Sequence, residues 1–530
     1  MADNYPSGLF GPGNGPPDEL DLDNQPGGNS GNDPSWLSGP YLEMSERWQP
    51  ILICMGGTQA FRENAASQLP IEPKEDEAAW RRRVSHAVLS PFLVRIADQA
   101  AGLITRKAIT LKMEDPEQPV DPWWEEFIEN VDGFGTDITS FARRTVLSSL
   151  LLGHAATMVD FPSTEPAPNL QVERELGLRP YWIPVRADQI LGWRKDGDSP
   201  ISPVGQIRIN EYVQENIGAF GDRTIRQIRI LERGAWSIWR KGDDGWYQHQ
   251  DGTTSLPVIP LAVTYSGKVS ELISNPPLLP VASLNLLHGQ RQADLQHALH
   301  VAALPVMYLK GWDDSDNSIA LSANTAILLP TDGEVGYAEP ASSAFESQQA
   351  FITELEQQME NLSISTLFHQ TYAAETAEAK ALNRTDSDSM LAVVARDLEK
   401  SLQNALDITG MYVGRDAPLV HVDKDFDLQS LDHQQVAEYQ SLYNNGVITH
   451  ETLLTVLKAG EVLPEIDVEA EIEAVEASKL SMLDLNASGG TLSESEEETQ
   501  EEEREGDSEV RRIVADRLRR MAGETEEDNS

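Results

Sequence analysis

The period of the hydrophobic pattern changes twice along this chain. Apolar residues recur every three or four positions from Ala79 to Arg106, which is typical of amphipathic helices. Between 180 and 265 they alternate with polar residues, as in Gln206–Asn210 and Thr224–Leu231, and this predicts antiparallel strands with one face in water. Helical spacing returns from Val281 onward. We therefore expect an α+β fold in which an antiparallel β subdomain lies between helical segments.

Four helical segments stand out by their apolar spacing. They are Asp137–Leu152, Val281–His300, Ala344–Leu367, and a long segment that starts at Thr385 or Asp386 and runs to Gly410. The apolar residues expected to share about one face are Leu284, Leu287, Leu295 and Leu299 in the second, Ile352, Leu355, Met359 and Leu362 in the third, and Leu391, Val394, Leu398, Leu402 and Ala405 in the fourth. Pro91, inside the 79–106 run, marks either a kink or the start of a helix. Short extended runs at Val306–Leu309 and Gly336–Tyr337 separate the second helix from the third. A smaller helical unit is expected at 415–480, with a helix that begins at Thr449.

The two ends of the chain have a different composition from its middle. Residues 1–40 hold Gly, Pro, Asn, Asp and Ser and few large apolar groups, and the chain from 486 onward is mainly Gly, Ser and Glu. Such segments cannot bury enough apolar surface to offset the entropy lost on ordering. We expect disordered termini: a flexible arm over 1–40 and an acidic flexible tail over 481–530.

The charge and cysteine content exclude several classes of protein. The 530 residues carry a net charge of −45, which disfavours a protein that coats nucleic acid but not one that lets DNA pass. Cys54 is the only cysteine, so disulfides within the chain and Cys-based zinc sites are excluded. No apolar run reaches the ~20 residues of a spanning helix. No membrane association or leader is expected.

The chain lacks the motifs of the common catalytic sites. It has no P-loop pattern, no H-E-x-x-H and no G-x-S-x-G. His288, His297 and His300 share one predicted helix, but no carboxylate or Cys set completes a metal shell. We therefore expect no enzyme and no cofactor, and we assign no catalytic, cofactor-binding or metal-ligating residue.

Several short strings, in their order along the chain, resemble the portal proteins of tailed bacteriophages, the head-to-tail connectors of the virion. The strings are Ala101-Gly102-Leu103-Ile104-Thr105-Arg106-Lys107, Pro276-Pro277-Leu278-Leu279 with Asn285 and His288, Ala303-Leu304-Pro305-Val306, Gly333-Glu334-Val335-Gly336-Tyr337-Ala338-Glu339-Pro340, Glu378-Ala379-Lys380 and Asn445-Gly446-Val447-Ile448-Thr449. The resemblance covers about 41–478 and neither end.

This resemblance implies a ring of twelve copies at one capsid vertex, through whose channel DNA is packaged and ejected. The implied partners are double-stranded DNA, the terminase large subunit, the major capsid protein and a head–tail adaptor. The implied location is the virion, with assembly in the cytoplasm of a bacterial host. The implied segments are a wing at 41–275, a stem helix at 276–300, a clip at 301–343, a second stem helix at 344–367, a tunnel loop at 368–384, a long wing helix at 385–414 and a crown at 415–480.

The polar segment at 368–384 is the candidate DNA-channel site. Lys380 and Arg384 are its only fixed positive charges, and His369 joins them when protonated. In a ring these side chains would form belts that touch phosphates without reading bases. An equally weighted alternative is that Lys380 and Arg384 pair with nearby glutamates or start the next helix.

Two other functions compete with the portal hypothesis. One is a different virion structural protein, such as an adaptor or a scaffold. The other, which we favour less, is an intracellular hydrolase that uses a pair of acidic residues. The native mass distinguishes a portal ring from a hydrolase, because a hydrolase would form a small oligomer.

Overall fold

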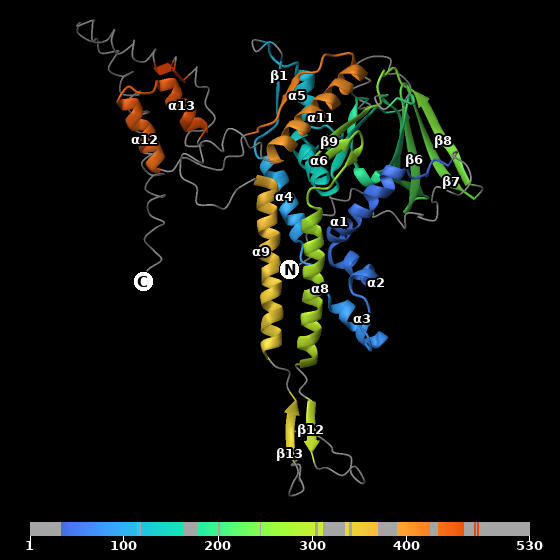
Figure 1. Ribbon diagram of the computed structural model, residues 1–530. Coiled ribbons are helices and arrows are strands. Elements are labelled where there is room, and N and C mark those ends of the chain that lie inside the picture. Colours follow the sequence, from blue (N-terminus) through green and yellow to red (C-terminus); the bar gives the residue numbers. More distant parts are fainter. Residues whose placement is uncertain are drawn as a thin grey trace. The chain divides into compact units, whose positions relative to one another are not determined.

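The computed structural model divides the chain into two compact units, 1–426 and 427–530. It describes residues 33–113, 115, 118–162, 178–199, 202–243, 245–302, 306–310, 334–338, 342–368, 390–424, 433–459, 471–472 and 474–475. Helices and antiparallel sheets are both present, and this confirms the predicted α+β class. Figure 1 labels the elements along the chain.

The N-terminal part of the first unit is helical. Its helices are α1 (Gly39–Glu63), α2 (Ala65–Gln68), α3 (Glu77–His86), α4 (Phe92–Ile104), α5 (Pro122–Ile128) and α6 (Ile138–Leu152). The run from Ala79 to Arg106 is therefore two helices, and Pro91 is the N-cap of the second. Pro91 thus marks the start of a helix and not a kink. Helix α6 confirms its prediction and ends at Gly153, whose φ of 90° suits glycine.

Two larger sheets follow α6. The first has the order β3–β2–β9, with strands Tyr181–Arg186, His154–Asp160 and Leu261–Tyr265; the short 3-10 turn η1 (Ala187–Gln189) follows β3. The second is the predicted β subdomain, with strands β4 (Ile190–Lys195), β5 (Val204–Ile217), β6 (Gly221–Glu232), β7 (Ala235–Gly242) and β8 (Gly245–Thr253) in sequential order. A small hairpin, β10 (Lys268–Ser270) and β11 (Ile273–Ser274), leads toward the next helix.

The polar face of the β subdomain differs from the expectation. Arg208, Asn210 and Gln227 are buried, although alternation predicted a face in water. Arg208 Nη1 donates to the backbone oxygen of Pro34 at 3.1 Å, which brings the N-terminal segment against this sheet. Leu37 is buried there too. The flexible arm predicted over 1–40 was therefore too long, because residues 33–40 dock on the body through these contacts.

The next part of the first unit is a helix–hairpin–helix sequence followed by a long helix. Its elements are α8 (Leu279–Ala302), β12 (Val306–Lys310), β13 (Glu334–Ala338), α9 (Ser342–Phe368) and α11 (Met390–Val413). Strands β12 and β13 pair antiparallel, with Val306 opposite Ala338. Helices α8 and α9 pack along each other (Figure 1). These elements confirm the helices predicted at 281–300 and 344–367; the predicted start of the long helix lies outside the described residues.

The remaining elements lie at the C-terminal side. Strand β14 (Leu419–His421) pairs with β1 (Thr110–Lys112), so the range predicted as a helical crown starts with a strand of the first unit. Val420 of this strand and Val422 just after it are buried. In the second unit, α12 (His433–Asn444) and α13 (His450–Ala459) confirm the predicted helices. The Thr449 hydroxyl accepts from the Thr452 backbone N–H at 3.2 Å, as expected of a helix cap.

Candidate functional site: the α8–α9 helix pair

The predicted DNA-channel residues His369, Lys380 and Arg384 lie outside the described residues. The structure therefore neither brings them together nor separates them. The helices that precede and follow this segment, α9 and α11, are described, and α8 packs against α9. The candidate site is accordingly built from this helix pair and the elements that hold it.

A buried asparagine fixes α8 against the start of α4. Asn285 is fully buried, and its Oδ1 accepts from the backbone N–H of Leu93 at 3.1 Å. Its Nδ2 donates to the backbone oxygen of Ser90 at 2.9 Å. The side chain thus satisfies an N–H in the first turn of α4 that has no partner within that helix. This pair of bonds sets the position of α8 along α4.

The burial of α8 differs from its predicted apolar stripe. Of the four leucines predicted to share about one face, Leu295 is buried, Leu284 and Leu287 are half-buried and Leu299 is exposed. Other residues of α8, large and small apolar ones as well as polar ones, are also buried, because α8 is enclosed by α1, α3, α4 and α9. At Gly289 an added Cβ would lie 2.7 Å from Leu89 Cδ1. A side chain at this position would require Leu89 to shift.

A histidine joins α8 to α9. His288 is buried, and its Nε2 lies 3.1 Å from Glu356 Oε1 of α9. The Phe92 ring meets the imidazole edge to face, with 5.1 Å between centroids. His288 therefore serves the packing of three helices, and within the described residues no group of three or more His, Cys, Asp or Glu side chains is arranged to hold a metal ion.

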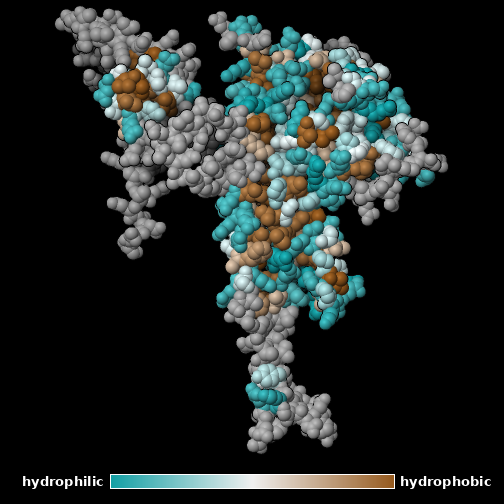
Figure 2. All heavy atoms as spheres, viewed as in Figure 1, coloured by the Kyte–Doolittle hydropathy of each residue, from teal (hydrophilic) through white to brown (hydrophobic). Residues whose placement is uncertain are grey.

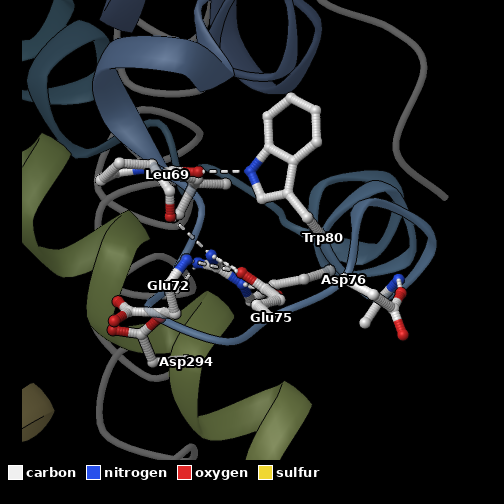
Figure 3. Close-up of polar contacts among 9 residues, drawn as sticks. Leu69, Glu72, Glu75, Asp76, Trp80 and Asp294 are labelled. Carbon is white, nitrogen blue, oxygen red and sulfur yellow. Dashed lines mark hydrogen bonds and ion pairs between the residues drawn. The ribbon is translucent and has the colours of Figure 1, made fainter.

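Arg83 of α3 forms a polar contact with Asp294 of α8. Figure 3 labels two of the partners of Arg83, Glu75 and Asp294. Its Nε and Nη2 donate to the two carboxylate oxygens of Glu75 at 3.0 and 2.8 Å, and Nη2 also donates to the backbone oxygen of Pro70. Its Nη1 lies 3.5 Å from Asp294 Oδ1 of α8. The Arg83 side chain is only 4% exposed. Such a two-oxygen contact fixes the orientation of the guanidinium as well as its position.

The pKa values of the two acids that contact Arg83 shift in the directions that this geometry predicts. Hydrogen bonds from Arg83 hold the pKa of the Glu75 carboxyl below its usual range. Partial burial raises the pKa of Asp294, and the charges of Arg83 and Arg291 oppose that rise. No pattern in the sequence could have predicted this contact, because Arg83 and Asp294 are 211 residues apart.

The outer face of α9 carries acidic residues without basic ones. Ile352, Leu355 and Met359 are buried, as predicted, and Glu346, Glu354 and Glu360 are exposed. The sequence has no Lys or Arg between Lys310 and Lys380, but it has 12 Asp and Glu there. This separation of acidic from basic residues is a further feature of the α8–α9 pair, besides its polar contacts. The composition of the residues between Lys310 and Lys380 could have revealed it.

The α8–α9 pair also leaves apolar side chains accessible to solvent. Phe351 of α9 is 41% exposed, and Leu284 and Leu287 of α8 are half-buried. Figure 2 shows hydrophobic side chains along the pair on the face in view. Among the helices of the described residues, none is both long and apolar enough to cross a membrane.

Comparisons with known proteins give one family match. The model of a family described as a domain of unknown function (DUF4055) matches residues 277–413, which run from just before α8 to the end of α11. A comparison with curated proteins finds no match.

Solved structures similar to this chain come from gene transfer agent (GTA) particles. A chain from the virion of a native GTA particle has 12% sequence identity and a TM-score of 0.38, and the match covers 73% of this chain and 94% of that chain. A chain from the neck of a native GTA particle, computed with C12 symmetry, has 12% identity and a TM-score of 0.36, with the same coverage.

Proposed function

We propose that this chain is the subunit of a portal ring in a tailed phage or a phage-like particle, and that it is not an enzyme. The observation that carries the proposal is the helix–hairpin–helix sequence from α8 through β12 and β13 to α9, attached to a body of helices and a β subdomain. Elements in this order match what the sequence resemblance implies for a portal subunit. Twelve copies would surround a channel for DNA at one capsid vertex.

The charge of α9 supports a channel that does not hold DNA tightly. Each Lys or Arg that neutralises a phosphate releases counterions and adds affinity. The stretch between Lys310 and Lys380 offers no such residue, and the acidic residues that it carries outside the contacts between copies repel phosphate. DNA would therefore slide past this stretch. The terminase and then the adaptor would dock on the ring.

The experiment that tests the proposal is a measurement of native mass together with negative-stain imaging of the purified chain. We expect rings of about twelve copies of the 58.5 kDa chain, with a central pore at least as wide as a DNA duplex. A monodisperse monomer or dimer over a range of salt concentrations would contradict the proposal and favour a small-oligomer enzyme that uses a pair of acidic residues.

A further inference from the structure

Two helices flank α8 on different sides. Helix α9 packs on one side of α8 and α3 on another, and in Figure 1 α8 lies between them. If copies assemble into a ring, as proposed above, each copy uses two different faces, because a ring joins subunits head to tail. The faces of α9 and α3 lie on different sides of α8, so they can supply two such faces.

The exposed face of α9 is negative in the part of the helix that lies beside Asp294 of α8. Asp294 of α8 lines a pocket with Ser347 and Phe351 of α9, so this part of α9 lies beside Asp294. The exposed acids nearest to it in the sequence of α9 are Glu346 and Glu354. At a rotation of 100° per residue they lie within a quarter-turn of each other on the helix.

The face of α3 is positive at the same level. Three arginines follow one another in α3. Arg83 is buried and contacts Glu75 and Asp294. The other two, Arg81 and Arg82, are exposed to solvent. The side chain of Arg81 is 72% exposed and pairs with Glu77 one turn away at 2.6 Å. Because Asp294 contacts Arg83, the exposed arginines lie at the level of Asp294, as Glu346 and Glu354 do.

Glu77 at the start of α3 pairs with Arg81 and offsets part of this positive charge, whereas the other two acids there are engaged elsewhere. The Asp76 side chain caps the helix by accepting from the backbone N–H of Ala79 at 2.7 Å. Glu75 is engaged by Arg83. The contact of Arg83 with Asp294 also holds α3 on α8, next to the position in the chain where Arg81 and Arg82 are exposed.

We infer that the exposed Arg81 and Arg82 of one copy dock against Glu346 and Glu354 on α9 of the next copy. This contact rests on the proposed ring and specifies which faces join its subunits. It also favours head-to-tail assembly over a two-fold dimer, because two α9 faces brought together would repel each other. The contact is between exposed charges and therefore weakens as salt screens it.

Charge reversal tests the contact from both sides. One variant carries Glu346→Lys and Glu354→Lys, and the other carries Arg81→Glu and Arg82→Glu. Each variant alone places like charges at every interface, and we expect at least a tenfold fall in the fraction of rings in native mass spectra at low salt. Mixed in equal amounts, the two variants can alternate around a ring with opposite charges at every contact. We expect the mixture to recover rings.

A matched control reverses charge at another site. Glu43 and Glu46 on α1 are exposed, and Glu43→Lys with Glu46→Lys should leave ring formation unchanged. Circular dichroism confirms that each variant is folded. If wild-type rings form and both test variants also form rings alone, the contact is wrong while the proposed function stands. Failure of the mixture to recover rings overturns the pairing, and a wild-type chain without rings overturns the proposed function and the contact together.

Discussion

His154 is a buried titratable side chain, and its environment determines how the stability of the fold should depend on pH. Burial lowers the pKa of His154 to about 4, against a small opposite effect of Asp188. Its Nδ1 lies 2.7 Å from the Ser274 hydroxyl. An imidazole in the unfolded chain titrates near a pH of about 6.5. Between these two values the unfolded chain binds a proton that the folded chain does not, so stability falls as pH drops through this window.

We expect this group to remove at most about 3 kcal/mol of stability between pH 7 and pH 4. In the variant His154→Asn, which has no titrating ring, that part of the pH dependence should disappear. Urea unfolding of both proteins at pH 7, 6 and 5 measures the difference. Parallel pH profiles for the two proteins would show that folding does not lower the pKa of His154 and would contradict this prediction.

The second prediction about a single residue concerns the ion pairs of Arg83. Arg83→Met removes the partner of the buried Glu75 carboxylate and the charge beside Asp294. Breaking a buried ion pair by removing one partner costs about 3 kcal/mol or more. Arg83→Lys keeps the charge but loses the two-oxygen contact, so its loss should be smaller. Thermal unfolding of the three proteins gives the order; equal stability of wild type and Arg83→Met would contradict the role of this contact.

At the scale of elements, α8 and α4 should be coupled through Asn285. Asn285→Ala leaves the Leu93 N–H and the Ser90 carbonyl buried without this partner. An unsatisfied buried group costs about 1–3 kcal/mol, and we expect a loss of about 2 kcal/mol in urea unfolding. The matched control, Ser283→Ala, changes an exposed residue of α8 and should have almost no effect. An Asn285→Ala loss no larger than that of the control would contradict the coupling.

The same elements show how far the sequence could predict the fold. The apolar stripe of α9 and that of α11, with Leu391, Val394 and Leu398, were predictable because each helix buries one face. The stripe of α8 was not, because four helices enclose it and bury its small and polar residues. The contact of Asn285 with Ser90 spans 195 residues. Periodicity reports which residues are apolar, and it contains no information about such distant partners.

At the scale of the whole molecule, the segment between α9 and α11 links the fold to the proposed function. The structure gives the helices on both sides, α9 and α11, but the predicted site within 368–384 remains a prediction from the sequence. Lys380 is the first fixed positive charge after Lys310, so in a ring it would follow a long stretch that repels DNA. This position suits a weak contact with phosphates at the end of that stretch, where it would slow DNA without holding it.

The double variant Lys380→Ala with Arg384→Ala tests this site. We expect rings of unchanged mass, because the contacts described above between α8, α9 and α3 are made by other side chains. Packaging of DNA or its retention in filled particles should change, and nuclease protection of packaged DNA measures both. A matched control, Lys241→Ala with Lys268→Ala, removes two exposed charges from the β strands and should leave both readouts unchanged. If the double variant fails to assemble, the two side chains are structural, as pairing with nearby glutamates would make them, and the channel-contact role is wrong.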